Sequence, residues 1–205
     1  MRFLTFRRYY LDEVLISTKF YGKVLDVGGK KDNKRGIFRP PLDTVVSWEY
    51  LNIDESTNPD YSCSADNIPV DDNTFDIIIL AEVVEHLENP IDVLQECYRV
   101  LKKDERIIIT IPFLNALHAD PYDFQRWTDV KIENELSKIG FKNINIQPMG
   151  GKAAVIYDLL NFSQTPSSFK TRIFRKILQM ISSIFKILDK PNRFITTGYL
   201  IEAKK

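Results

Sequence analysis

Short apolar segments alternate with helical segments along most of the chain, and this alternation constrains the fold more than any other feature. The apolar segments are rich in β-branched and aromatic residues, which is typical of strands. They are KVLDV (23–27), VSWEYLNI (46–53), FDIIIL (75–80), RIIITIP (106–112), KNINIQ (142–147) and FITTGYLIEA (194–203). Strands that are apolar along their whole length are buried on both faces, so helices must cover both sides of a mostly parallel sheet. The pattern therefore predicts an α/β fold with one doubly wound sheet.

Three further segments have the spacing of amphipathic helices. Residues 5–18 mix aromatic, aliphatic and charged residues at helical intervals. The segment at 90–101 begins with a proline suited to a first turn, and the segment at 128–140 begins with a capping threonine and ends with glycine. Helical residues also separate the last two strand candidates. The last strand is therefore expected to enter the sheet late and to run antiparallel.

Composition excludes several classes of protein. The 205 residues, 44% of them hydrophobic, suffice for one domain with a full core. Basic and acidic residues both number 28, so no overall field attracts the chain to nucleic acid. Cys63 and Cys97 are not spaced as metal ligands, which predicts no metal site and a reducing compartment, the cytoplasm. Charged residues interrupt the N-terminal apolar residues and no long apolar run follows, so neither a signal peptide nor a membrane-spanning helix is expected.

Acidic residues and glycines follow the first strand candidate. In open α/β sheets a ligand binds at the carboxyl ends of the strands, near the point where the strand order switches. Asp26 lies at that end of the strand, and Gly28 and Gly29 follow it. Glycine allows the backbone to approach a ligand closely, and a carboxylate can accept hydrogen bonds from an ammonium group. An ordinary glycine turn after a buried strand is the alternative interpretation.

Two more acidic positions follow, the first of them 28 positions after Asp26, somewhat beyond the spacing of the ribose-binding carboxylate in a dinucleotide fold. Asp54 comes directly after the second strand candidate, where a carboxylate could hold a ribose diol or could simply cap a turn. Twelve positions further on, Asp66 could accept a hydrogen bond from an adenine amino group. The backbone N–H of Asn67 could donate to the adjacent ring nitrogen, and Ile68 could supply an apolar surface.

Five motifs in this order resemble a known family, the class I S-adenosylmethionine-dependent methyltransferases of the methyltransferase-11 type. They are VLDVGG, YLNID, SADNIPVDDNTFDIIILAEVVEHLENP, YRVLKKDERIIITIPF and HADPYDFQRWT, within about residues 23–150. The ordered set is far more specific than any single motif, because each depends on the spacing of the others. The resemblance implies a Rossmann-like, mostly parallel sheet of seven strands with the last strand antiparallel.

The resemblance also implies roles for single residues. Asp26, Gly28 and Gly29 would border the methionine part of S-adenosylmethionine, Asp54 would hold the ribose hydroxyls, Asp66 and Asn67 would hold adenine, and Ala81, Glu82 and Val83 would line the pocket. One position departs from the family, since Lys30 stands where a third glycine is usual. The same lysine argues against a nicotinamide enzyme, because the GxGxxG loop that binds a pyrophosphate is absent after the first strand. The cofactor expected is S-adenosylmethionine, which leaves as S-adenosylhomocysteine.

Candidate substrate residues follow the later strands. His118 lies in HADPYDFQRWT and is our candidate for a general base, although it could equally be a loop histidine that bonds backbone groups. The same loop offers Tyr122, Asp123 and Arg126, which suit a polar or sugar-like acceptor, although Arg126 could instead pair with Asp123. His86, near the end of the strand at 75–80, could orient the pocket or cap a turn.

Residues 168–190 form a candidate basic amphipathic helix. Isoleucines and a leucine recur along one face at positions 173, 177, 181, 184 and 188, and lysines and arginines lie elsewhere. Such a helix could lie on an anionic membrane at its inner face, cover the substrate pocket or form a homodimer contact. The simplest alternative is a helix packed on its own domain.

The single domain would thus comprise four parts. They are an N-terminal helix in 1–22, a cofactor-binding core in 23–150, a helical insert or lid in 151–192 and the last strand in 193–205. The predicted function is S-adenosylmethionine-dependent methyl transfer, at oxygen, to a small-molecule or glycan or lipid-linked acceptor, as in the polysaccharide pathways of similar bacterial enzymes. A catalytically inactive cofactor-binding module that serves as a partner or regulatory subunit is the alternative. Nucleic-acid methylation is disfavoured by the zero net charge and by AEVVEH, which contains no aromatic-proline base-flipping motif.

Overall fold

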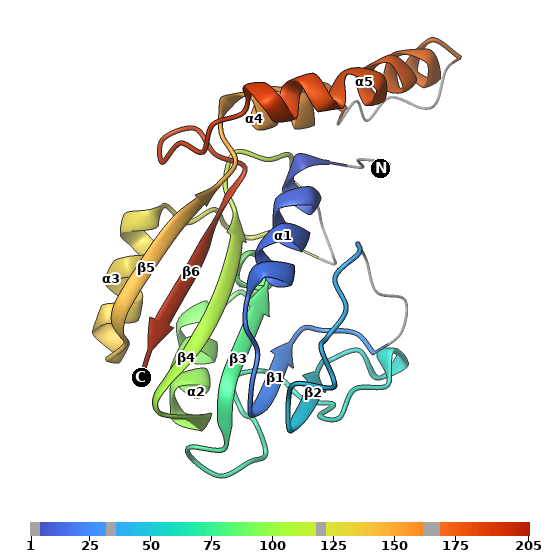
Figure 1. Cartoon of the computed structure of the whole chain (residues 1–205). Coiled ribbons are helices and arrows are strands. Elements are labelled where there is room, and N and C mark those ends of the chain that lie inside the picture. The colour runs from blue at the N-terminus through green and yellow to red at the C-terminus, as the bar shows by residue number, and fades with distance from the viewer. Residues whose placement is uncertain (1–4, 32–35, 118–121, 162–168) are drawn as a thin grey trace.

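A single twisted sheet with helices on both faces forms the body of the molecule (Figure 1). The computed structural model describes residues 5–31, 36–117, 122–161 and 169–205. The strands are β1 Lys23–Val27, β2 Ser47–Leu51, β3 Phe75–Ala81, β4 Leu101–Pro112, β5 Lys142–Met149 and β6 Gly198–Lys204. Their order across the sheet is β2-β1-β3-β4-β6-β5. Strands β1 to β4 pair in parallel, and β6 pairs antiparallel with both β4 and β5.

This topology confirms the predicted α/β class and the antiparallel last strand. The chain runs outward from β1 to β2 and then crosses to β3 on the other side of β1, so the strand order switches between β1 and β3. A crevice is expected at the carboxyl ends of these two strands. The last strand is shorter than the sequence pattern suggested: it begins at Gly198, and before it the hydroxyl groups of Thr196 and Thr197 donate to the carbonyl of Met149.

The expectation of seven strands needs correction, since the described residues form six. Beyond β2 the sheet continues only as an isolated parallel bridge between Leu51 and Tyr61. The chain reaches Tyr61 through Asn58, which has a left-handed backbone with φ 51°, and then Pro59, which has no N–H to donate to a ladder. A further edge strand therefore does not extend in this segment.

Five α-helices and two short 3₁₀ helices in the described part of the chain surround the sheet. They are α1 Phe6–Ser17, η1 Glu55–Thr57, η2 Val84–His86, α2 Pro90–Val100, α3 Asp129–Ile139, α4 Lys152–Asn161 and α5 Phe169–Leu188. The helix predicted at 128–140 has the expected ends, because the Thr128 side chain accepts from Lys131 N and Gly140 adopts φ 118°. None of the helices in the described ranges has both the length and the apolar character required to cross a bilayer.

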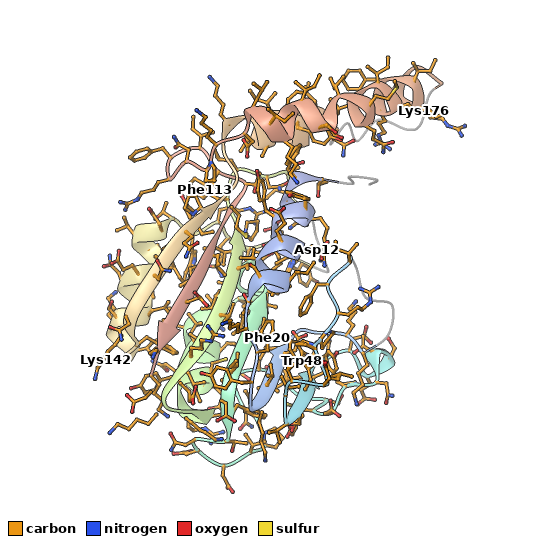
Figure 2. All side chains as sticks on the ribbon, in the orientation of Figure 1. Asp12, Phe20, Trp48, Phe113, Lys142 and Lys176 are labelled. Carbon is orange, nitrogen blue, oxygen red and sulfur yellow. The ribbon has the colours of Figure 1, made fainter. Side chains whose placement is uncertain are left out.

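The two faces of the sheet have separate cores. On one face, apolar residues of α2 and α3 such as Leu94 and Leu136 pack against Leu25 and Ile107 of the strands. On the other face α1 packs through Leu11 and Leu15 (Figure 1). Below α1, the rings of Phe20 and Trp48 meet edge-on with centroids 5.0 Å apart (Figure 2). Because successive strand residues point to opposite faces, the continuous apolar strands fill both cores.

Helices α4 and α5 follow β5 and precede β6 in the sequence, and they cross the top of the molecule as drawn in Figure 1. A third cluster, which includes Phe6, Ala154, Tyr157 and Leu178, joins them to α1. The buried carboxylate of Asp158 accepts hydrogen bonds from the backbone N–H groups of Phe6 (2.6 Å) and Arg7 (2.9 Å). The first turn of α1 is therefore fixed to the helical insert.

Candidate active site

A cavity of about 500 Å³ lies at the carboxyl ends of β1, β2 and β3, with α1 as one wall. This is the crevice expected from the switch in strand order. Its lining comprises Arg7, Arg8, Leu11, Leu15, Asp26, Val27, Gly28, Gly29, Lys30, Phe38, Pro40, Trp48, Tyr50, Leu51, Asn52, Ile53, Asp54, Cys63, Ser64, Ala65, Ile79, Ala81, Glu82, Val83, His86 and Leu87. The predicted residues Asp26, Gly28, Gly29, Asp54, Glu82 and His86 thus share one cavity.

The end of β1 supplies a carboxylate held by close packing. Asp26 Oδ2 accepts a hydrogen bond from Trp48 Nε1 at 3.3 Å. A Cβ at Gly29 would lie 2.4 Å from Asp26 Cγ, and Gly28 adopts φ 76° with no room for a Cβ beside Val83. The two glycines therefore allow the loop to fold tightly around the carboxylate. Lys30, in place of a third glycine, follows them and also lines the cavity.

Asn52, which the sequence interpretation overlooked, ties the ends of β1 and β2 together. Its Nδ2 donates to the carbonyls of Gly28 (3.2 Å) and Gly29 (3.1 Å). Its Oδ1 accepts from the backbone N–H of Asp54 at 2.9 Å. The sequence shows only an asparagine in LNID at the end of a strand. The residues that it bonds are 23 and 24 positions away, and the sequence does not identify them.

Asp54 caps a turn, which is one of the two roles that the sequence left open, and its contact with a ribose stays a prediction. Its Oδ1 caps η1 by accepting from Ser56 N (3.0 Å) and Ser56 Oγ (2.6 Å), and these two bonds hold the pKa of the carboxyl below its usual value. The residue also lines the cavity. Asp54 is therefore a fixed carboxylate at the end of β2.

The predicted adenine residues lie next to the cavity wall, not in it. The wall in this region consists of Cys63, Ser64 and Ala65. The Asn67 N–H is donated to the Ser64 carbonyl at 3.3 Å. The side chain of Ile68 is buried in the core, and its N–H donates to Glu96 Oε1 at 2.7 Å. The contacts expected from Asp66, Asn67 and Ile68 therefore stay predictions.

The opposite wall carries an ion pair that joins α1 to the end of β3. Arg7 Nη1 donates to Glu82 Oε2 at 2.5 Å, and both side chains are largely buried. Glu82 has a left-handed backbone (φ 58°), and its N–H is held by the carbonyl and the hydroxyl oxygens of Thr110. Arg7 was not a predicted site residue, because only the packing of α1 brings it to the cavity.

His86 is held at the cavity by the chain after β4. Its Nδ1 contacts the Tyr122 carbonyl at 2.5 Å, which places the proton on that nitrogen, because a carbonyl can only accept. Arg126 pairs with Asp123 through Nη2 and Oδ2 at 2.6 Å, as the simpler interpretation of these residues expected. The ring of Tyr122 is exposed and does not line the cavity. His118 lies outside the described residues.

Glu85 is a second residue that the sequence interpretation missed. It precedes His86 on η2, and its side chain is almost fully buried. Burial raises the pKa of the Glu85 carboxyl to about 8, and the nearby Glu82 carboxylate adds to this effect. The carboxyl is therefore mostly protonated at neutral pH. In the described ranges no cluster of histidine, cysteine, aspartate and glutamate side chains could hold a metal ion.

Comparison with known proteins agrees with this arrangement. The family model described as "Methyltransferase domain" matches residues 46–109. A SAM-dependent methyltransferase from Archaeoglobus fulgidus is similar in structure, with TM-score 0.59, 20% identity and coverage of 97% of this chain and 92% of that one. No curated protein matches the sequence.

Two other solved structures with a similar fold are named for different reactions. Phosphoethanolamine N-methyltransferase 2 of Haemonchus contortus, in complex with phosphomonomethylethanolamine and S-adenosylhomocysteine, matches with TM-score 0.58 and 16% identity. The match covers 97% of this chain but 52% of the other, so this chain spans about half the length of that enzyme. The [4+2]-cyclase SpnF matches with TM-score 0.60 and 14% identity over 97% and 81% of the two chains. The resemblance and the fold expected from it are confirmed: the chain has the α/β fold of S-adenosylmethionine-dependent methyltransferases, and residues 46–109 match their methyltransferase domain.

Proposed function

We propose that the chain binds S-adenosylmethionine in the cavity at the ends of β1, β2 and β3 and transfers its methyl group to an acceptor. The observation that carries this proposal is the convergence of Asp26, Asn52 and Asp54 on one cavity, in the fold of methyltransferases. Asp26 would accept from the cofactor's ammonium group, and Asp54 from its ribose hydroxyls. Cys63, Ser64 and Ala65 would border the adenine.

Methyl transfer from a sulfonium requires mainly that the nucleophile, the methyl carbon and the sulfur lie in line. Correct positioning of reactants supplies up to roughly 7–11 kcal/mol of the barrier reduction in well-oriented reactions. The contacts among Asn52, the first loop and Asp54 hold these residues in place and would fix the position of the cofactor. The Arg7–Glu82 pair and His86 form a polar wall that is suited to hold the acceptor.

The acceptor that we propose is a hydroxyl group of a small molecule, a glycan or a lipid-linked glycan. A polar wall with a histidine suits a polar acceptor better than an apolar one. A hydroxyl gains from removal of its proton during transfer, and His118 is our candidate for that base. Unchanged turnover in His118→Ala, measured with the acceptor found below, would remove this role.

The proposed function is tested by a binding assay and a transfer assay on the same purified chain. Isotope-labelled S-adenosylmethionine is titrated first, and its methyl group is then followed into fractions of a cell extract. Binding followed by transfer is the expected result. Binding without transfer to any fraction would favour an inactive cofactor-binding module, and absence of binding would refute the proposal for the cavity.

Gly29→Ala is expected to weaken the binding of S-adenosylmethionine moderately. The new Cβ would lie 2.4 Å from Asp26 Cγ, so the carboxylate must rotate away from its present position. The backbone at Gly29 does not have a positive φ, so alanine itself is tolerated there. We expect S-adenosylmethionine to bind about tenfold more weakly, as for one lost charge-assisted hydrogen bond, with little change in the melting temperature. Calorimetric titration measures this, and an affinity equal to that of the unmodified chain would show that the orientation of Asp26 is unimportant.

A further inference from the structure

Helix α5 attaches to the molecule by a narrow stripe. Among its described side chains, Leu178, with 3% of its surface exposed, and Ser182 are buried, and the Phe185 ring packs on Tyr157 of α4 with centroids 5.4 Å apart. The helix is 20 residues long and extends past the body of the molecule (Figure 1). Most of its described surface is therefore open.

The open surface of α5 includes its apolar face. Met180 and Ile187 are each 81% exposed. The exposed apolar residues in the described part of the helix, most of which recur at intervals of three and four, are Ile173, Phe174, Ile177, Met180, Ile181, Ile184, Ile187 and Leu188. Residues at these intervals share one side of a helix, so they form a continuous stripe, which we call the apolar face of α5. The helix does pack on its own domain, as the simplest expectation from the sequence had it, but through Leu178, Ser182 and Phe185 and not through this face.

All charged residues of α5 are basic. The segment 169–188 contains five lysines and arginines and no acidic residue, in a chain whose net charge is zero. Arg172 lies two turns and Lys176 one turn before Met180, and both border the apolar face; Lys176 projects away from the body (Figure 2). Lys186, by contrast, faces the domain, where it lies over the Tyr9 ring and near Glu13.

The apolar face and the site lie at the same edge of the sheet. The cavity is lined by residues that follow the carboxyl ends of β1, β2 and β3. Helix α4 begins directly after the carboxyl end of β5, which runs parallel to β4 because both pair antiparallel with β6. Through Asp158 the insert also holds α1, whose Arg7 lines the cavity. A surface bound by α5 would therefore lie at the side of the molecule on which the cavity is built.

We propose that α5 binds the surface of an anionic lipid bilayer, with its apolar face among the acyl chains near the headgroups and Arg172 and Lys176 at the lipid phosphates. An exposed apolar face bordered by cations is the pattern of helices that lie in the membrane interface. Charge complementarity favours anionic lipid over a second copy of the chain, because α5 helices paired face to face would bring cations of the same sign together. This inference does not require methyl transfer and deepens the proposed function only by placing the cavity near lipid-linked acceptors.

The proposal is tested by co-sedimentation of the full chain with vesicles. One set contains phosphatidylcholine alone and the other phosphatidylcholine mixed with phosphatidylglycerol. We expect binding to the anionic vesicles, weakened by added salt, and little binding to the neutral ones. Arg172→Gln with Lys176→Gln should weaken binding to anionic vesicles about 25-fold, at about fivefold for each cation near an anionic surface.

A matched pair of variants tests the apolar face. Met180→Glu with Ile187→Glu places two acids on exposed positions, so the chain should fold normally and lose binding to anionic vesicles. Leu42→Glu with Val46→Glu places the same charges on residues that are 68% and 76% exposed in the segment before β2, and binding should persist with a small electrostatic decrease. Absence of binding to anionic vesicles, equal binding to neutral vesicles, or equal loss in the two pairs would overturn the proposal. A dimer that the first pair disrupts, without vesicle binding, would assign the face to a second copy instead.

Discussion

Asp54→Ala is expected to weaken the binding of S-adenosylmethionine about 100-fold, the largest effect on affinity that we predict. Asp54 is an ionised carboxylate, because the two bonds from Ser56 to its Oδ1 hold its pKa below the usual value. It lines the cavity at the end of β2, where a ribose diol can donate two hydrogen bonds to it. Hydrogen bonds to a charged group each contribute about tenfold or more to affinity. Calorimetric titration with S-adenosylmethionine measures the change.

Two variants separate this role from the capping of η1. Asparagine is as good a helix cap as aspartate, so Asp54→Asn keeps the bond from Ser56 N and removes only the charge. Its affinity should lie between those of the unmodified chain and of Asp54→Ala. Asp71→Ala removes another exposed turn aspartate, away from the cavity, and should bind normally. If Asp54→Ala bound as tightly as Asp71→Ala, the assignment of the ribose site would be wrong.

The strands were predictable because their signal is local. Residues 75–80 and 106–112 are mostly apolar. Strands of this composition must be buried on both faces, whatever their place in the sheet. The sequence alone did not predict the edge of the sheet correctly. Whether the segment around Tyr61 extends as a strand depends on the backbone at Asn58 and Pro59. It also depends on the pairing available at Leu51, which is set by tertiary structure.

In the site, too, local sequence predicts some residues and tertiary packing alone determines others. Asp26 lies at the end of β1 and Asp54 shortly after β2, so the sequence predicts both at the carboxyl edge of the sheet. Arg7 reaches the same cavity from a helix 75 residues before its partner Glu82, and no local pattern specifies that distance. Glu85 resembles any exposed helical glutamate in the sequence, and only the packing of η2 buries it.

For α5 the sequence predicted an amphipathic helix but not which of its sides is covered. Periodicity identifies an apolar stripe, and a stripe normally faces the domain to which it belongs. The side that contacts α4 is instead the one with Leu178 and Ser182, between the apolar face and the cations. Where a helix ends up on its domain depends on the neighbouring surface, here Tyr157 and Phe6, which lie far away in the sequence.

Stability should fall as the pH rises from about 4.5 to about 8, and Glu85→Gln should remove most of this decrease. Burial raises the pKa of the Glu85 carboxyl from its ordinary 4.5 to about 8. Between these values the folded chain holds a proton that the unfolded chain has lost, so the free energy of unfolding decreases by up to about 1.4 kcal/mol per pH unit. Below the lower value both states are protonated and the contribution is complete. Glutamine has the same shape and no charge at any pH, so the variant should be the more stable protein at pH 8.

The upper part of this pH range separates the effect of Glu85 from that of Asp158, a second carboxyl whose pKa burial raises. Burial also raises the pKa of Asp158, but only to about 6, so its contribution ends there. Urea unfolding between pH 6 and 8 should therefore show a falling free energy in the unmodified chain and a flatter one in Glu85→Gln. Glu88→Gln is the matched control, since Glu88 lies three residues further on and is exposed, and it should follow the unmodified chain. Parallel curves for Glu85→Gln and Glu88→Gln would mean that Glu85 is ionised in the folded protein, and the wall beside His86 would then carry a second negative charge at neutral pH.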